Sequence, residues 1–584
     1  GHVHDNIQFD GLVGPGKLLV GSAGNEGDRP MYIGRNFSNT DTSMYTFLAA
    51  YVNGQARNSG PLLAELWGVK NDQFNVNISI YNTATNSFEA QTGFVSSNSN
   101  NTFQSVLQGT NNVSVQYLIY TEINPQNGKP HMIIQALNFQ PDNDRKILLT
   151  IRGQNTSIKM WATNYGANNE NIFTNFGYGG VFSGSTTSTI SEVGGTGKSV
   201  ITVGSYVSKR SWNALNGSTY TYNSSYIQSM IAPYSSKGPT PDGRTKPDIT
   251  APGTTLASSL NSFYTARNNT NYIFNTDKIT KNGKDYYFFM SQGTSMAAPM
   301  VTGIIALWME RYPELTKDQA IELIKTTAIT DAFTGTIPAQ GSNTWGWGKI
   351  DAFGGQLLLN NSIPSKPNYN PPVYCAEQNN ILVADSGHNG YQWSTGDSTR
   401  SITQTKVGKY AYRVRNQKGY YSQWSDSAEI HPLPNATITS LFNDILTAGP
   451  AHSYQWYKDG SPISGANQQS HKVDTTGEYY VVVTDSNGCS KASASIRVIP
   501  TGIEQIGRTG GINVFPNPAT NNITISGLKD VAHYQISDLS GRVMSSGDIN
   551  TGTQDINISG LSSGMYILHI DSAGEQYMIK LSKQ

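Results

Sequence analysis

The pattern of hydrophobic and polar positions predicts an α/β core built from two separated parts of the chain. Short apolar runs at 18–20 and 201–205 predict buried strands of a parallel sheet. A longer apolar run predicts a helix over 296–310. Residues 1–30 and 179–361 therefore predict an α/β core, a parallel sheet with helices on its faces.

Residues 31–178, between the two parts of this core, have a different pattern. Polar and apolar residues alternate strictly over 74–80, and β-branched and aromatic residues dominate 114–120 and 146–152. Asn and Gly turns separate these runs, which is typical of antiparallel strands. The segment predicts an inserted β-sandwich, whose role as a substrate-restricting wall, a stabilising clamp or a passive decoration stays open.

The chain after residue 361 is expected to be all-β. A Pro-rich linker at 362–372 should be extended. Two modules follow at 373–432 and 433–500; each has a Tyr-Gln-Trp strand and a later Gly-Xaa-Tyr strand, and both resemble immunoglobulin-like domains. We expect them to act either as a spacer or as a module that binds glycan or a surface.

Composition narrows the function classes. The 584 residues carry 40 basic and 40 acidic side chains, and this zero net charge argues against nucleic-acid binding. Only 14% of residues are charged, and polarity comes mainly from Asn, Ser, Thr and Gly, as is common in exported β-rich proteins. No apolar run reaches the roughly 18 residues that span a bilayer.

Two cysteines are too few for a disulfide scaffold or a Cys-based zinc site. Cys375 and Cys489 either pair across neighbouring modules or remain free thiols in the cores. We expect them to be unpaired.

Candidate chemistry concentrates in two segments. Gly-Thr-Ser-Met-Ala-Ala-Pro at 293–299 places Ser295 at the start of the predicted helix, where free N–H groups and the helix dipole stabilise an oxyanion. The alternative is an ordinary helix start with a Ser cap. The apolar run at 18–20 leads into a Gly-rich turn that displays Asn25, whose amide can donate a hydrogen bond to an oxyanion.

These segments resemble the subtilisin family of serine proteases. Four motifs occur in the family's order: the Asn25 strand and turn, Ser-Ser-Lys-Gly-Pro-Thr (235–240) with Lys-Pro-Asp-Ile-Thr-Ala-Pro-Gly (246–253), Gly-Thr-Ser-Met-Ala-Ala-Pro (293–299) and Gly-Trp-Gly-Lys-Ile-Asp-Ala (346–352). The resemblance implies that Ser295 is the nucleophile and that Asn25 and the Ser295 N–H form the oxyanion hole. It also implies protein or peptide substrates bound beside Ser22, Ala23, Gly24 and Thr294.

The base of a serine protease is not found among the matching motifs. In the family, the catalytic Asp and His precede the oxyanion Asn. The 24 residues before Asn25 contain His2, His4 and Asp5 without the family's motifs, and His131 lies in the insertion. We expect the chain to be the C-terminal portion of a longer endopeptidase, inactive as given because its Asp and His precede Gly1. A non-catalytic surface adhesin on a degenerate protease core is the alternative.

The last module, 510–584, is also expected to be a small antiparallel β-sandwich. Its Pro-Asn-Pro turn (516–518), Asp-Leu-Ser-Gly-Arg hairpin (538–542) and Leu-Ser-Ser-Gly-Met-Tyr strand (561–566) resemble the type A C-terminal sorting domain of type IX secretion substrates. The resemblance implies recognition by that secretion machinery and a secreted or surface-attached protein of a Bacteroidota-type bacterium.

No cofactor is expected to be required, and no metal ligand is assigned. Loops at 242–244 and 485–488 lack the ligand series of an EF-hand and are better explained as turns. A structural calcium, which many subtilases bind, is matched to no residue.

Overall fold

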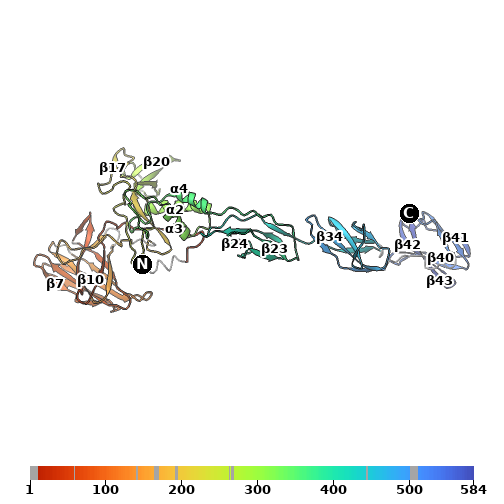
Figure 1. Ribbon diagram of the computed structural model, residues 1–584, viewed down its shortest axis with the longest axis horizontal. Helices are drawn as coiled ribbons and strands as arrows, with labels where there is room; N and C mark the ends of the chain where they lie inside the picture. Colours follow the sequence, from red (N-terminus) through yellow and green to blue (C-terminus); the bar gives the residue numbers. More distant parts are fainter. Residues whose placement is uncertain are drawn as a thin grey trace. The chain divides into compact units, whose positions relative to one another are not determined.

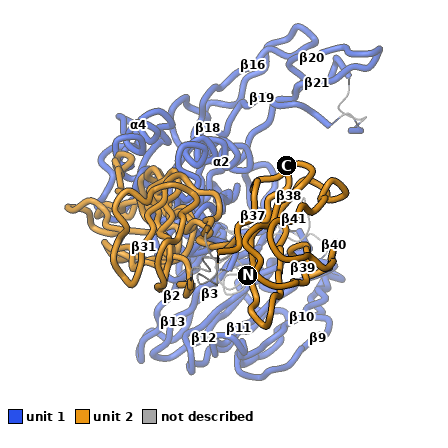
Figure 2. Tube along the Cα trace, turned by 90° about the vertical axis from the view of Figure 1, so that its right-hand side faces the viewer, with its two compact units in different colours: residues 1–363 blue, residues 364–584 orange. Residues whose placement is uncertain are grey.

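The computed structural model describes residues 11–57, 59–139, 143–163, 170–190, 195–261, 263–264, 269–441, 445–499 and 511–584 (Figure 1). The chain divides into two compact units, Gly1–Ile363 and Pro364–Gln584 (Figure 2). The division falls inside the Pro-rich segment that predicts a linker.

The first unit contains the predicted parallel sheet. Strands β1 (Leu19–Ser22), β15 (Val200–Val207) and β18 (Ile249–Thr254) pair in the order β1-β15-β18, and both pairs are parallel. β15 is buried along nearly its whole length, whereas β1 is only half-buried. The prediction of a buried β1 is therefore wrong for the residues described, in which β1 pairs on one side only and lies at the sheet edge.

In the described residues, three helices accompany this sheet. Helix α2 (Thr294–Arg311) begins two residues earlier than predicted and is followed by α3 (Lys317–Thr327) and α4 (Ala352–Ser362). The sequence Thr-Lys-Asp-Gln at 316–319 predicts a capping box at the start of α3, and the structure confirms it: Thr316 accepts from the Gln319 N–H, and the Gln319 side chain accepts from the Thr316 N–H. No helix in the described ranges is both long and apolar enough to cross a membrane.

Helices α2 and α4 meet at a buried tryptophan. Trp308 of α2 is fully buried, and its indole N–H donates to the Ala352 carbonyl at 3.2 Å. A Cβ at Gly355 of α4 would lie 2.0 Å from the indole ring. The glycine is required because only a residue without a side chain lets α4 approach the ring so closely.

An antiparallel β-sandwich lies between β1 and β15 in the sequence. One sheet has the order β2-β13-β5-β11-β10-β9, and the other has the order β14-β3-β12-β6-β7, with β4 and β8 at its sides. Both sheets contribute to one apolar core, which includes Met44, Leu66, Ile78 and Ile134. The strands are β2 (Tyr32–Asn36), β3 (Ser43–Val52), β4 (Gln55–Arg57), β5 (Leu62–Trp67), β6 (Phe74–Asn82), β7 (Ser87–Gln91), β8 (Val95–Ser96), β9 (Thr102–Gln108), β10 (Ser114–Ile123), β11 (Pro130–Leu137), β12 (Arg145–Gly153), β13 (Ser157–Ala162) and β14 (Glu170–Thr174).

Besides β18, the described residues between β15 and α2 form two smaller antiparallel sheets. They are formed by β16 (Ser211–Asn213) with β17 (Thr219–Thr221), and by β19 (Leu256–Ser259), β21 (Lys284–Ser291) and β20 (Asn275–Lys281). Aromatic rings connect them: Trp212 stacks on Phe274 with ring centroids 5.5 Å apart and contacts Tyr222 at 4.9 Å. Tyr222 in turn stacks on Tyr226 at 4.7 Å.

The second unit is built of β-strands in the residues described. The first module contains β22 (Tyr374–Cys375), β23 (Asn380–Val383), β24 (Gly390–Trp393), β25 (Ser401–Gln404), β26 (Gly408–Tyr410), β27 (Tyr412–Arg415) and β28 (Ala428–His431). The second contains β29 (Ile438–Leu441), β30 (Ile445–Ala448), β31 (Ser453–Lys458), β32 (Ser461–Pro462), β33 (Ser470–Lys472), β34 (Gly477–Thr484), β35 (Ser490–Ala492) and β36 (Ile496–Val498). Trp393 and Trp456, from the repeated Tyr-Gln-Trp strands, are each fully buried in their module's core. The resemblance to immunoglobulin-like domains stays a prediction.

A disulfide bond joins Cys375 of the first module to Cys489 of the second, and the expectation of unpaired cysteines is therefore wrong. The Cα atoms are 5.6 Å apart, within the range that a disulfide spans. The two residues are 114 positions apart, so their proximity depends on how both modules fold.

The C-terminal region forms two further antiparallel sheets, ordered β37-β38-β41 and β40-β39-β42-β43. They share an apolar core that includes Ile523, Ile536 and Leu568. The strands are β37 (Asn513–Phe515), β38 (Asn522–Leu528), β39 (Ala532–Asp538), β40 (Val543–Ile549), β41 (Gly552–Asn557), β42 (Gly564–Ser572) and β43 (Glu575–Lys583).

Candidate active site

Ser295 is the second residue of α2, and its side chain is exposed. The helix begins after Gly293, whose φ of 145° and ψ of 161° are accessible to glycine and strained for other residues. The N–H groups of Met296 and Ala297 donate back to the Gly293 carbonyl, at 3.0 and 3.4 Å. The Thr294 N–H donates to Asn25. Of the first four N–H groups of the helix, only that of Ser295 has no hydrogen-bond partner among the described residues, so it can receive an anion.

Asn25 lies in the turn that follows β1, and its amide is held against the start of α2. Its Oδ1 accepts hydrogen bonds from the Thr294 N–H at 2.9 Å and from the Thr294 hydroxyl at 3.2 Å. With Oδ1 occupied, the NH2 group is left as the donor of this side chain. That group lies beside the nucleophile turn, because a Cβ built on Gly293 would be 3.6 Å from Asn25 Nδ2.

Thr294 connects the other residues that the sequence proposes for substrate binding. Its side chain is fully buried, and its hydroxyl also accepts from the Gly24 N–H at 3.1 Å. Ala23 is buried as well and donates its N–H to the Val203 carbonyl at 3.0 Å, which prolongs the pairing of β1 with β15. The structure thus brings 22–25 together with 293–296.

The remaining motif segments support this arrangement without contributing a nucleophile. Lys246 is buried in an ion pair with Asp248, and the Asp248 carboxylate accepts from the Thr202 N–H of β15 at 2.7 Å. Gly346 lies directly against the start of β18, since a Cβ there would be 2.3 Å from the Asp248 carbonyl and 2.6 Å from the Ile249 nitrogen. Ser236 accepts from the Glu26 N–H at 3.0 Å, next to Asn25.

The histidines considered as a base lie elsewhere. His2 and His4, with Asp5, lie outside the described residues. His131 belongs to the inserted sandwich, where its ring nitrogens lie 2.9 Å from Glu122 and 3.0 Å from Glu65. Burial lowers the pKa of His131, but the two carboxylates outweigh burial and raise it overall. The role of His131 in the described structure is therefore an ion-pair cluster and not a base at Ser295.

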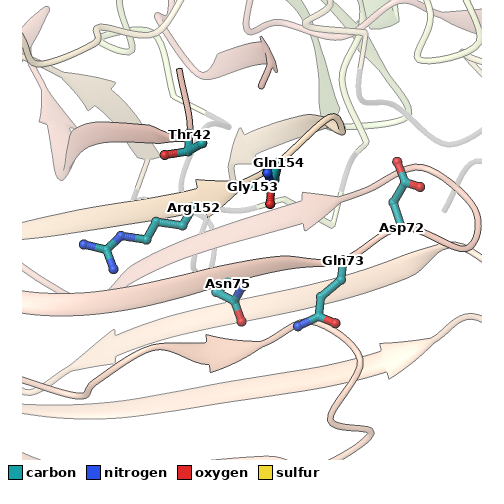
Figure 3. Close-up of a pocket in the computed structure, with 7 residues that line it drawn as sticks. All are labelled: Thr42, Asp72, Gln73, Asn75, Arg152, Gly153 and Gln154. Atoms are coloured by element: carbon teal, nitrogen blue, oxygen red, sulfur yellow. The ribbon is translucent and has the colours of Figure 1, made fainter. Parts of the chain in front are cut away.

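An open depression of about 490 Å³ lies on the same sandwich (Figure 3). Arg152 and Asp72 stand on opposite sides of it in this view. All of its lining residues belong to the insertion, so it is separate from the groups around Ser295. The residues that line it are Thr42, Asp72, Gln73, Asn75, Arg152, Gly153 and Gln154.

The described part of the chain contains no candidate metal site. No group of three His, Cys, Asp or Glu side chains there is arranged to hold a metal ion. The statements that no cofactor is required and that a structural calcium can bind stay predictions.

Sequence reasoning missed one residue at the helix start. The Tyr234 hydroxyl accepts a hydrogen bond from the Gly293 N–H at 3.1 Å. Its only sequence signal is its position, directly before the Ser-Ser-Lys-Gly-Pro-Thr motif.

Comparisons with known proteins identify families for two parts of the chain. Residues 64–348 match the subtilase family, Peptidase_S8, and residues 513–584 match a secretion system C-terminal sorting domain. Serine protease AprX of Bacillus subtilis (strain 168) is 36% identical over 136 residues, which is 23% of this chain and 26% of AprX. Uncharacterized protein aq_aa18 of Aquifex aeolicus (strain VF5) is 30% identical over 182 residues, 30% of this chain and 73% of that protein.

The chain therefore contains a subtilase-family domain and has serine proteases among its relatives. Its C-terminal sorting domain points to a secreted or cell-surface protein. The chain spans about a quarter of the length of AprX.

Proposed function

We propose that this protein is a secreted serine endopeptidase that hydrolyses peptide bonds through an acyl-enzyme on Ser295. The proposal depends on one observation: two hydrogen-bond donors from distant parts of the chain, Asn25 and Ser295, lie at the start of the same helix. The Ser295 N–H has no partner among the described residues, and the Asn25 amide is anchored through Thr294 so that its NH2 group remains as a donor.

The reaction follows from the placement of these groups. The Ser295 hydroxyl oxygen attacks the carbonyl carbon of the scissile bond and forms a C–O bond, while a general base accepts the hydroxyl proton. The carbonyl oxygen becomes an oxyanion, which the Ser295 N–H and the Asn25 NH2 stabilise. Collapse breaks the C–N bond, the amine leaves with the proton from the base, and water hydrolyses the acyl-enzyme.

Substrate backbone would lie along 22–24, with Ser22 at the end of β1. Thr294 is better assigned a positioning role than a direct contact, because it is buried and its N–H and hydroxyl bond to Gly24 and Asn25. The general base and its orienting Asp stay a prediction; the family order places them before Asn25. We further propose that residues 510–584 are recognised by the type IX secretion machinery and removed by proteolysis.

A fluorophosphonate probe tests the proposal. The complete natural protein should be labelled at Ser295, and the Ser295→Ala variant should not be. Ser291→Ala, four residues earlier and also near the helix start, is the matched control and should label like the wild type.

Absence of labelling in a complete, folded protein would contradict the proposal. It would favour a non-catalytic surface protein instead.

A further inference from the structure

Tyr234 bonds to Gly293, the residue directly before the nucleophile helix, and is the centre of a buried hydrogen-bond cluster. Its hydroxyl is within bonding distance of the Gly253 carbonyl at 2.9 Å, the Thr254 hydroxyl at 2.8 Å and the Ser205 hydroxyl at 2.9 Å. It also accepts from the Gly293 N–H at 3.1 Å. One phenol oxygen therefore joins β15, β18 and the start of α2.

The surroundings keep this hydroxyl protonated and fixed. Tyr234 is 8% exposed, and Ser205 and Thr254 are fully buried. Burial raises the pKa of the Tyr234 phenol, so that it stays neutral and serves as donor and acceptor together. The carbonyl of Gly253 can only accept, so the Tyr234 proton is directed to it or shared with the two hydroxyls.

Gly293 is held at both ends by this arrangement. Its N–H is shared between the Gly253 carbonyl at 2.9 Å and the Tyr234 hydroxyl, and its own carbonyl accepts the N–H groups of Met296 and Ala297. On its other side lies the Asn25 amide, 3.5 Å from the position of a Cβ. The orientation of the Gly293 peptide therefore sets the direction of the next two N–H groups. The Thr294 N–H points to Asn25, and the Ser295 N–H is the proposed oxyanion donor.

We propose that Tyr234 is a positioning residue for catalysis: its hydroxyl holds Gly293 and so aligns the two oxyanion donors, the Ser295 N–H and the Asn25 NH2. The inference rests on the proposed function for its catalytic part. Tyr234 itself touches neither substrate nor nucleophile. Removing one oxyanion donor outright costs on the order of 10²–10³ in kcat, and loosening both donors should cost less.

The first test compares Tyr234→Phe with Tyr222→Phe in the complete protein. Tyr222 belongs to the adjacent aromatic stack, and its hydroxyl bonds to no described residue, so its loss is a matched control. Tyr234→Phe should lower kcat about 10-fold and leave KM within about twofold. Tyr222→Phe should leave both parameters within twofold of the wild type.

The second test does not depend on activity. Hydrogen–deuterium exchange of the peptide that covers 290–298 should be several-fold faster in Tyr234→Phe and unchanged in Tyr222→Phe. Wild-type exchange in Tyr234→Phe would overturn the inference, as would faster exchange with unchanged kcat in an active enzyme. A wild type without Ser295-dependent turnover contradicts the proposed function instead, and the exchange measurement still decides whether Tyr234 holds Gly293.

A double-mutant cycle separates positioning from general stability. In an Asn25→Ala background one donor is already missing, so Tyr234→Phe should lower kcat by less than it does in the wild type. Equal effects in both backgrounds would show that Tyr234 does not act through the oxyanion donors, and would overturn the inference.

Discussion

The side-chain oxygen of Asn25 lies 2.9 Å from the backbone nitrogen of Thr294, 269 residues further along the chain. This hydrogen bond crosses from the turn after β1 to the first residue of α2. It orients the amide whose NH2 group is the proposed oxyanion donor. The bond thereby holds the turn after β1 against the start of α2, although the whole inserted sandwich separates them in the sequence.

Asn25→Ala should lower kcat by about 10²–10³ and leave KM nearly unchanged, because the donor acts on the transition state. Asn25→Asp is the sharper variant. Its carboxylate can still accept from Thr294, but it lacks the NH2 donor and adds a charge that repels the oxyanion. We expect Asn25→Asp to lose at least as much kcat as Asn25→Ala with less loss of stability. Substantial activity in Asn25→Asp, measured with a peptide substrate, would exclude the donor role.

Thr294→Val should destabilise the first unit by about 1–3 kcal/mol, because the buried Gly24 N–H loses its acceptor. Thr294→Ser keeps the hydroxyl and should recover most of that loss. Denaturant unfolding followed by tryptophan fluorescence measures both. Equal stability of the two variants would mean that the hydroxyl does not hold the Gly24 turn.

The inserted sandwich should lose stability as pH rises through the titration of His131. The pKa of His131 is raised, so its contribution is complete below the unfolded value near 6.5 and is lost above the folded value. The pKa values of Glu65 and Glu122 are lowered by His131, so their contribution is lost as pH falls below about 4.5. Melting temperatures between pH 5 and 9 should decline in the wild type and stay flatter in His131→Gln. The same decline in both proteins would exclude His131 as the cause.

Glu89 should contribute strongly to the stability of the same inserted sandwich. Burial opposes its ionisation, but the Arg145 guanidinium and hydrogen bonds from Thr110 and Asn82 lower its pKa to about 2. Glu89→Gln leaves the buried Arg145 without its carboxylate and should cost about 3–5 kcal/mol. Asp285→Asn, at the exposed ion pair of Asp285 with Lys278, is a control that should leave stability nearly unchanged, because solvent screens exposed ion pairs.

Loss of the Cys375–Cys489 bond should destabilise the two modules by about 4–5 kcal/mol on a chain-entropy estimate for a loop of this length. The double variant Cys375→Ser with Cys489→Ser tests this by denaturant unfolding of the second unit. A reductant should lower the unfolding midpoint of the wild type and leave that of the double variant unchanged.

The sequence was most informative where local chemistry determines structure. The capping box at Thr316 and Gln319 involves residues three positions apart, so it could be predicted and is confirmed. The parallel strand over 201–205 could also be predicted from its continuous apolar run. Ser295 and Asn25 were recognised from their motifs, and the expectation that they lie close together came from the resemblance to subtilisins.

Contacts between distant segments could not be predicted in the same way. The bond from Gly24 to Thr294 joins residues 270 positions apart, and the Tyr234 cluster depends on how β15, β18 and α2 converge. The cysteine pair was predicted wrongly for the same reason, since spacing alone gives no distance between two modules. Half-burial of β1 depends on which neighbours it has in the sheet, which its own residues do not specify.

The disulfide also determines how the second unit responds to mechanical tension. A pull transmitted along the backbone into Cys375 passes through the sulfur bridge to Cys489 and bypasses the residues between them. While the bridge is intact, residues 376–488 are shielded from the load. Reduction would place about 113 residues in the line of force, and their full unravelling would lengthen the tether by up to about 400 Å.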